Sequence, residues 1–232
     1  MIFFNGKSLE SVADVKIDDI RVSPIQYSPV ARPRAINAGS VLVRNKVGTR
    51  TVTITFALLD DNETTRQNAL LAISEWAKSD KEYRLEVPNY PQFYLMAMCT
   101  AKPEPSLRIW WESKLRIVFT CFTDPYLISK SEKSVSCGTQ FNVLGDGIPL
   151  MRIERTLSES ASNQSYSNGE QTMTFSTIPA GNLVIDLNEQ TAFVGNTDIM
   201  QYYNPLSEFV IPKTGIQTIS GTGTVRYRER WE

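Results

Sequence analysis

Two pairs of adjacent aspartates, Asp18-Asp19 and Asp60-Asp61, are the side chains of this 232-residue chain that come nearest to an acid–base site. Acid–base catalysis requires a proton donor and a proton acceptor that reach the same substrate. Neighbouring residues of a strand point to opposite faces, however, and carboxylates that precede a helix serve as caps. We therefore expect neither pair to be catalytic.

Several kinds of active site are excluded because the sequence contains no histidine. Triads with an imidazole base, HExxH zinc sites and every imidazole metal ligand are thereby ruled out. Cys99, Cys121 and Cys137 lack CxxC spacing, and no Gly-rich phosphate loop occurs. The sequence predicts no enzyme, no metal and no cofactor. It also predicts reduced thiols, with Cys99 and Cys121 packed in strands as small apolar side chains rather than bridged.

A sugar contact is the small-molecule chemistry that one local cluster suits. Tyr202, Tyr203 and Asn204 place two aromatic rings beside an amide, and aromatic rings combine a large apolar face with a polar edge. Paired tyrosines near a proline also occur as packed loops, and this alternative stays open. We keep the three residues as candidate sugar contacts.

A basic segment is the strongest charge feature of the chain, whose 24 basic and 25 acidic side chains balance to a net charge of −1. Residues 21–50 contain no acid, and their basic residues are Arg21, Arg32, Arg34, Arg44, Lys46 and Arg50. The centre, SPVARPRAINAGS, is rich in Pro, Ala and Gly, which predicts an extended loop. Such a loop suits an acidic partner, either another subunit or a phosphate backbone, and a solvated loop is the open alternative.

The elements that must position these residues are mostly strands, because apolar and polar residues alternate along the chain. In the stretch TVTITF at 51–56, the threonines share one face, and Val, Ile and Phe share the other. One helix is predicted after Asp60-Asp61-Asn62, with an apolar stripe of Leu70, Ile73, Trp76 and Ala77. Further strands of the first half are predicted at 12–22, 40–47, 83–87, 93–100, 106–111 and 115–122.

Two domains are predicted from a change of composition after FTDPY, which ends at Tyr126. Residues 1–128 have the pattern of an α+β domain, residues 129–146 that of a linker rich in Ser, Lys and Gly, and residues 147–232 that of an all-β sandwich. Pro125 cannot donate to a strand ladder, which favours a domain boundary there. A strand end inside one domain is the alternative. Asn168-Gly169 predicts a hairpin in the second half.

No targeting or membrane-spanning segment is evident in the sequence. The N-terminus, MIFFNGKSLE, lacks a basic region and an apolar core, and the longest apolar run, FYLMAMC, is far too short to cross a bilayer. We therefore expect synthesis in the cytosol and no membrane partner.

The order of these features resembles the distal tail proteins (Dit) of long-tailed, non-contractile bacteriophages. In the first half the resemblance rests on an opening strand at Asn5-Gly6, the arginine-bearing segment, the TVTITF strand, one helix, a Trp hairpin and the strand that ends in FTDPY. In the second half it rests on GIP at 147–149, GNLVIDLNEQTAFVGN at 181–196, FVIPKTGIQTISGTG at 209–223 and VRYRERW at 225–231. Each motif is weak alone, but the ordered set spans nearly the whole chain.

The resemblance implies a mainly β fold. Its N-terminal domain would be a β-sandwich with one helix, related to tail-tube subunits, and its C-terminal domain a galectin-like β-sandwich. It also implies a structural hub at the virion tail tip, made in the host cytoplasm. The hub would be a homo-hexameric ring, or two stacked rings, that joins the tail-tube protein to the tip proteins. A receptor-binding protein is a candidate further partner, and DNA would pass through the lumen.

The basic segment then acquires an expected role. Arg32, Arg34, Arg44, Lys46 and Arg50 would pair with acidic groups of a neighbouring subunit and hold the ring, because arginine binds carboxylates through a planar fork and stays charged when desolvated. The rival is that these side chains face the lumen and touch passing DNA. The second half lacks a long insertion, so no direct receptor-binding role follows. A carbohydrate-binding β-sandwich that aids host attachment is the alternative function.

Overall fold

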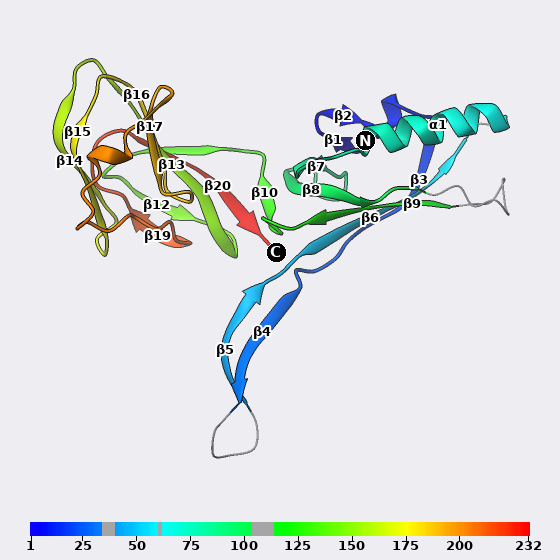
Figure 1. The fold of residues 1–232 in the computed structure, drawn as a ribbon, viewed down its shortest axis with the longest axis horizontal. Helices are drawn as coiled ribbons and strands as arrows, with labels where there is room; N and C mark the ends of the chain where they lie inside the picture. Colours follow the sequence, from blue (N-terminus) through cyan, green and yellow to red (C-terminus); the bar gives the residue numbers. More distant parts are fainter. Residues whose placement is uncertain (34–39, 60–61, 104–113) are drawn as a thin grey trace. The chain divides into compact units, whose positions relative to one another are not determined.

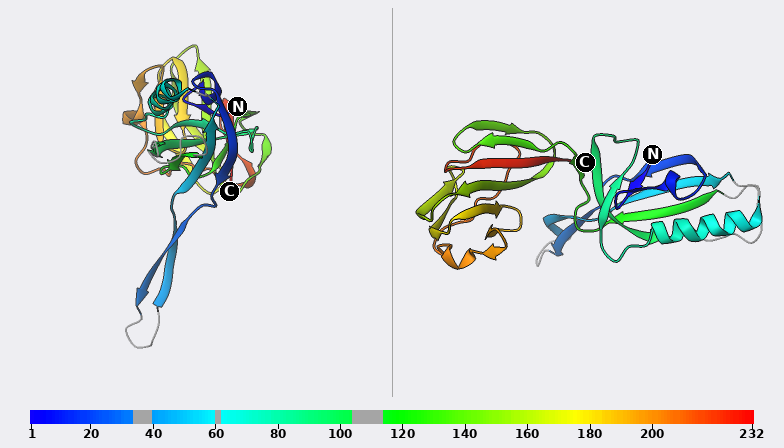
Figure 2. Two further views of the ribbon diagram at one scale, coloured as in Figure 1. Left: turned by 90° about the vertical axis from the view of Figure 1, so that its right-hand side faces the viewer. Right: turned by 90° about the horizontal axis from the view of Figure 1, so that it is seen from above.

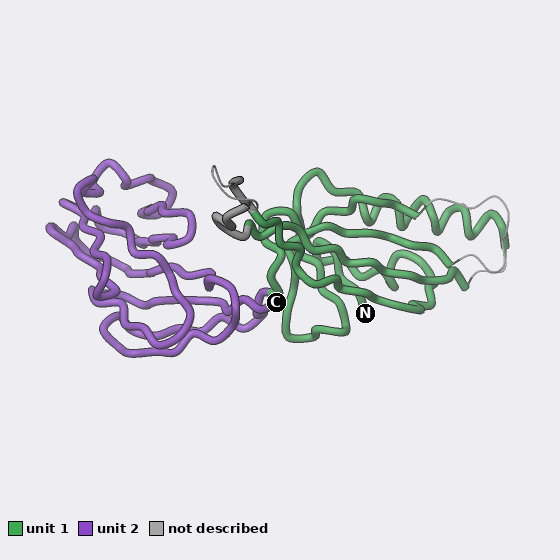
Figure 3. Tube along the Cα trace, turned by 90° about the horizontal axis from the view of Figure 1, so that it is seen from below, with its two compact units in different colours: residues 1–127, 232 green, residues 128–231 purple. Residues whose placement is uncertain are grey.

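The computed structural model describes residues 1–33, 40–59, 62–103 and 114–232, which form two compact units (Figure 3). Unit 1 is Met1–Leu127 together with Glu232, and unit 2 is Ile128–Trp231. Over the described residues the protein is mainly β with one α-helix (Figure 1), which confirms the predicted fold class. The division follows the FTDPY stretch, where the Asp124 side chain accepts a hydrogen bond from the Tyr126 N–H at 3.3 Å.

Unit 1 is built on an antiparallel sheet whose central strand is the predicted alternating segment. β6 (Arg50–Leu58) pairs with β3 (Val15–Val22) on one side and with β9 (Leu115–Cys121) on the other. β8 (Phe93–Ala101) continues the sheet beyond β9. Val52, Ile54 and Phe56 are completely buried, and the intervening threonines are half-buried on the opposite face. The strand predicted at 106–111 lies outside the described residues.

The apolar face of this sheet is covered by the helix and by short strands. α1 (Glu63–Trp76) lies along the sheet (Figures 1 and 2), and it begins at Asn62, whose side chain accepts a hydrogen bond from the Thr64 N–H at 2.8 Å. The Trp76 ring packs edge-on against Phe4 and Phe119, with centroid distances of 5.8 and 6.0 Å. Besides β8, the remaining elements here are β1 (Phe3–Phe4), β2 (Lys7–Ser8), the 3-10 turn Leu9–Ser11 and β7 (Tyr83–Glu86), with strand order β2-β1-β7-β8.

The basic segment forms a two-stranded ribbon: its centre contains a strand where an extended loop was predicted, whereas the strand predicted at 40–47 is confirmed. β4 (Tyr27–Pro33) and β5 (Ser40–Val47) are antiparallel and, among the described strands, pair only with each other (Figure 1). Pro29 lies opposite Asn45, and Pro33 lies opposite Ser40. Every residue of an interior strand donates its N–H to one of the two neighbouring strands, and proline has no N–H to donate. Each strand of a two-stranded ribbon has one free edge, where no such donor is needed. The ribbon therefore tolerates a composition that argued against a strand.

Unit 2 is an all-β fold around the long strand β13 (Gly147–Leu157). β13 pairs with β16 (Gly181–Asp186) and with the final strand, β20 (Thr224–Trp231). Beyond β16 follow β17 (Thr191–Val194), β18 (Thr197–Asp198) and the 3-10 turn Met200–Tyr202. β14 (Ala161–Ser167) and β15 (Thr172–Ile178) form the hairpin predicted at Asn168-Gly169. The strands share one core of completely buried side chains that includes Ile153, Phe175, Ile185 and Val225.

The stretch predicted as a linker, residues 129–146, is folded into unit 2 instead. After β10 (Leu127–Ser129), β11 (Lys133–Ser136) pairs with β20, and β12 (Gln140–Val143) pairs with β19 (Gly215–Thr218). Its apolar residues Val135, Cys137, Phe141 and Val143 pack into or against the core of the unit. Val135 and Cys137 at β11, and Phe141 and Val143 in β12, are each two residues apart, so alternation gives each strand one apolar face although the composition is polar. That spacing, rather than the content of Ser, Lys and Gly, decided the structure.

Candidate functional site

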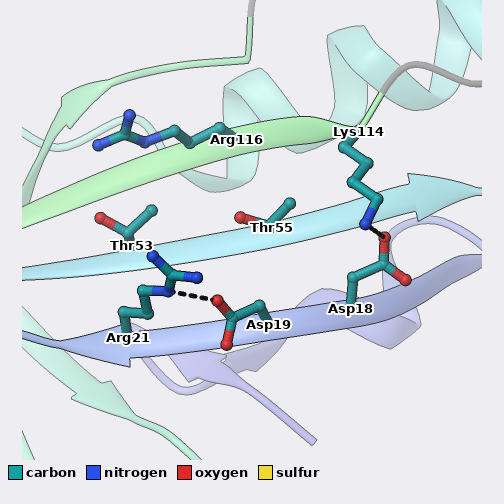
Figure 4. Close-up of a pocket in the computed structure, with 7 residues that line it drawn as sticks. All are labelled: Asp18, Asp19, Arg21, Thr53, Thr55, Lys114 and Arg116. Atoms are coloured by element: carbon teal, nitrogen blue, oxygen red, sulfur yellow. Dashed lines mark hydrogen bonds and ion pairs between the residues drawn. The ribbon is translucent and has the colours of Figure 1, made fainter.

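A polar hollow of about 510 Å³ lies on the face of the sheet formed by β3, β6 and β9. Its lining is drawn in Figure 4 and consists of Asp18, Asp19, Arg21, Thr53, Thr55, Lys114 and Arg116. The Arg21 Nε donates to Asp19 Oδ2 at 2.5 Å, and the Lys114 Nζ lies 3.7 Å from Asp18 Oδ2. Each carboxylate thus faces a cation. The arrangement is that of a polar surface whose charges neutralise one another locally.

A β-bulge places both aspartates at this hollow, against the expectation that a strand would separate them. Ile17 lies opposite Phe56, but Asp19 lies opposite the next residue, Thr55, so Asp18 is an extra residue in β3. An extra residue resets the alternation of side chains along a strand, and Asp18 and Asp19 therefore reach the same face. Alternation alone carried no signal for this bulge.

The five basic residues predicted at a subunit interface have different positions in the structure. Arg32 lies in β4 opposite Val41, and Arg44 lies in β5 opposite Val30, whereas Arg34 is outside the described residues. Lys46 is exposed near the end of β5. Arg50 begins β6 and is only 3% exposed. The basic segment therefore contains cations of the β4–β5 hairpin and one buried cation of the main sheet.

Arg50 is a buried cation with incomplete pairing. Its Nε and Nη1 atoms have no hydrogen-bond partner. Burial lowers the pKa of the guanidinium, and the neighbouring Cys121, Tyr90 and Tyr126 oppose that shift. Arg50 lines a pocket of about 260 Å³ together with residues 22–25, Tyr90, Leu127 and Glu232. Sequence reasoning included Arg50 among the basic residues but gave no sign that it would be buried.

The candidate sugar contacts are divided between packing and a second hollow. The Tyr203 ring packs against Phe175 and Phe209, with centroid distances of 5.8 and 5.6 Å, and its hydroxyl donates to the Ser207 carbonyl at 2.6 Å. The Tyr202 side chain also packs against the core of unit 2. Asn204 lines a hollow of about 340 Å³ with Asn163, Thr174, Phe175 and Ser176. Of the three candidate residues, Asn204 is the one that lines this hollow.

The three cysteines are free, as predicted. Cys121 is completely buried, and burial raises its pKa to about 12. Burial also raises the pKa of Cys99 and of Cys137. Because the thiolate is the nucleophile and the metal ligand, these thiols are poorly reactive at neutral pH.

Metal ligands do not gather anywhere in the described chain: its residues include no group of three or more Cys, Asp or Glu side chains arranged to hold an ion. Within the same residues, no helix has the length and apolar character needed to cross a membrane.

Comparison with known proteins identifies a similar fold over the complete chain. No family model matches the sequence, and no curated protein does. A crystal structure of the SPP1 Dit protein, described as a paradigm of the hub adsorption apparatus in phages that infect Gram-positive bacteria, aligns with a TM-score of 0.79 and 14% sequence identity. The alignment covers 100% of this chain and 98% of that chain.

Two structures of the phage P2 baseplate in its activated conformation, one with Ca and one with Sr, align less well. In each, the TM-score is 0.47 and the identity is 9%, with 94% of this chain and 91% of that chain covered. The described part of the chain therefore has the fold of the SPP1 Dit protein, in agreement with the family that the sequence resembles.

Proposed function

We propose that this protein is the structural hub of a phage tail tip. Six copies would form a ring, or two stacked rings, that joins the tail-tube protein to the tip proteins and lets DNA pass through its lumen. The observation that supports this proposal is the full-length alignment with the SPP1 Dit protein, which leaves almost none of either chain unmatched. The role is structural rather than enzymatic, and its place is the virion tail, after synthesis in the host cytoplasm.

A ring also gives the basic segment a purpose. Arg32, Arg34, Arg44, Lys46 and Arg50 would meet acidic groups of the adjacent copy. The β4–β5 hairpin supports this proposal because, among the described strands, it pairs with no other strand of its own chain. A ring repeats each such contact once per subunit, so weak individual ion pairs can add to a stable assembly.

Mass measurement and imaging of the purified protein test this function. Light scattering coupled to size exclusion should give about six times the chain mass of 26.2 kDa, or about twelve times for stacked rings. Negative-stain images should show rings with a central hole. If the protein remains monomeric at every concentration, and also after addition of tail-tube or tip protein from the same phage, the proposal is wrong.

A carbohydrate-binding sandwich is the second candidate function. It is supported by the hollow that Asn163, Ser176 and Asn204 line with polar side chains on unit 2. Against it stands the Tyr203 ring, which packs against Phe175 and Phe209 instead of offering a free face to a sugar. Binding to a glycan array, lost on Asn204→Ala, would favour this candidate, and an array without binding would dismiss it.

A further inference from the structure

Three charged side chains are buried in the described chain, namely Arg50, Asp124 and Glu229. Arg50 differs from the other two in its pairing. Glu229 accepts hydrogen bonds from the Lys133 ammonium at 2.6 Å and the Leu144 N–H at 3.1 Å. Asp124 accepts one from the Tyr126 N–H. Arg50, by contrast, has two nitrogens without a partner, on a side chain that is 97% removed from solvent.

Such an arrangement is unfavourable unless another group completes it. A buried guanidinium loses its hydration, and only hydrogen bonds or an opposite charge compensate for that loss. Acids that lie near Arg50 or near Cys121, the residue opposite it, have other partners. Glu82 accepts from the Phe122 and Thr123 N–H groups, Asp124 from the Tyr126 N–H, and Glu232 from the Tyr27 hydroxyl. The isolated subunit therefore leaves Arg50 incompletely paired.

The pocket beside Arg50 has room for the missing group and a lining that indicates its chemistry. Its volume is about 260 Å³, enough for the end of an acidic side chain. Val22, Pro24, Ile25 and Leu127 make much of its wall apolar, and Ser23 and Tyr90 add hydroxyls. Arg50 is the cation of this lining and Glu232 is its acid, which accepts from the Tyr27 hydroxyl and not from Arg50 Nε or Nη1. The unpaired guanidinium in a mostly apolar wall suits a singly charged carboxylate on an aliphatic stem better than a phosphate, which carries more charge and needs more donors.

We propose that this pocket receives a carboxylate side chain from a second copy of the chain, which pairs with Arg50 when the subunits associate. The proposal rests on the ring assembly proposed above and names the recognition event within it. In a ring of identical chains joined head to tail, one surface of each copy must fit a different surface of the next. A cation that lacks a partner in one copy is then expected, because its acid lies on the neighbour.

The test replaces the charge without removing the bulk. Arg50→Met keeps an unbranched side chain of similar length in the pocket and removes the unpaired guanidinium. We expect the unfolding temperature of the dissociated subunit to stay the same or rise, since replacing an incompletely paired buried charge by an apolar group is often neutral or stabilising. We expect the dissociation constant for self-association to rise about thirtyfold or more, which corresponds to about 2 kcal/mol for one side of a buried ion pair.

A matched control is Arg84→Met in β7. Arg84 already has partners in its own chain, since its Nε lies 2.7 Å from Glu86 Oε1 and its guanidinium stacks 4.4 Å from the Tyr94 ring centroid. This substitution should lower the unfolding temperature of the subunit and leave the dissociation constant unchanged. Sedimentation velocity over a dilution series measures association, and calorimetry of the diluted protein measures subunit stability.

The outcomes separate this inference from the ring itself. If the wild type assembles and Arg50→Met assembles with the same dissociation constant, the pocket inference is wrong while the ring stands. If Arg50→Met lowers subunit stability as Arg84→Met does, Arg50 is satisfied within its own chain and the inference is wrong. If sodium acetate or phosphate raises the unfolding temperature of the wild type but not of Arg50→Met, with association unchanged, the pocket holds a free anion. A wild type that stays monomeric refutes the ring and the second-copy occupant together.

Discussion

Glu132→Gln is expected to destabilise unit 2 because three arginines share this carboxylate. Arg152 Nη1 lies 3.0 Å from Glu132 Oε1, Arg226 Nη1 lies 3.4 Å from Oε2, and Arg228 Nε lies 3.6 Å from Oε1. Glu154 is the second acid of the cluster and pairs with Arg152 and Arg226 at 2.7 and 2.5 Å. Glutamine keeps the shape of Glu132 but removes its charge, which leaves the cluster with three arginines and one carboxylate, Glu154.

The expected magnitude follows from the burial of the cluster. An exposed ion pair contributes about 0.2–1 kcal/mol, and loss of one partner of a fully buried pair costs about 3–5 kcal/mol. The Glu132 side chain is 18% exposed, and its three arginine partners are 27–41% exposed, so the cluster lies between these limits. We expect a loss of about 2 kcal/mol, which lowers the unfolding temperature of a unit of about 100 residues by about 8 °C or more.

Scanning calorimetry of the full chain measures this shift, and hydrogen exchange in β13 and β20 locates it. The control is Glu170→Gln, since Glu170 is 72% exposed and pairs with Lys213 alone in the described structure; its change should stay within about 0.5 kcal/mol. In 1 M salt, where the screening length is about 3 Å, the effect of Glu132→Gln should shrink. A Glu132→Gln variant as stable as Glu170→Gln, or an effect that salt does not reduce, would refute the reasoning.

Three other predictions concern acid stability, core packing and a turn. Burial raises the pKa of Glu154, but hydrogen bonds and charge from its arginine partners outweigh burial and lower it. The stabilisation from Glu154 is therefore complete above pH 4.5 and is lost as the pH falls through its folded-state pKa. Denaturation measured from pH 7 to pH 3 tests this, and Glu154→Gln should make the free energy of unfolding depend less steeply on pH. Ile54→Ala, at a completely buried position, should cost about 2–5 kcal/mol in urea denaturation, whereas Thr53→Ala on the polar face should cost less than about 1 kcal/mol, and equal losses would contradict the assigned faces. Gly223→Ala should destabilise the protein by more than about 1 kcal/mol because Gly223 has a φ of +126° and an added Cβ would lie 2.6 Å from the Glu154 carbonyl oxygen; Gly138→Ala, also at positive φ but in open space, is the control and should cost less.

Local patterns predicted the elements that depend on a single segment. The TVTITF stretch became the central strand of unit 1 because alternation assigns one face to the core before any partner is known. Asn62 capped α1, and Ile73 and Trp76 were buried, because helical spacing brings their side chains to one side. The Asn168-Gly169 turn joined β14 to β15, because a glycine tolerates the positive φ of +89° found there.

Predictions based on average composition were less successful. Residues 129–146 have the composition of a linker, yet apolar residues at alternate positions of β11 and β12 pack these strands onto the core of unit 2. The segment of β4 has the composition of a loop, yet its prolines fit a ribbon with free edges. In both cases strand formation depends on which backbone groups and which face must be satisfied, and composition averages these over the segment.

The sequence by itself determined the chemistry available to this protein and the type of its elements. A chain without histidine has no imidazole chemistry wherever its residues lie, and strand alternation and helix caps are properties of neighbouring residues. Only the tertiary structure decided the environment of the charged groups. One extra residue in β3 brings Asp18 and Asp19 to the same face, and the packing around the start of β6 buries Arg50 without a full set of partners. Burial and pairing depend on segments far apart in the chain, and the free energy of a charge depends on both, so no local pattern could have predicted either site.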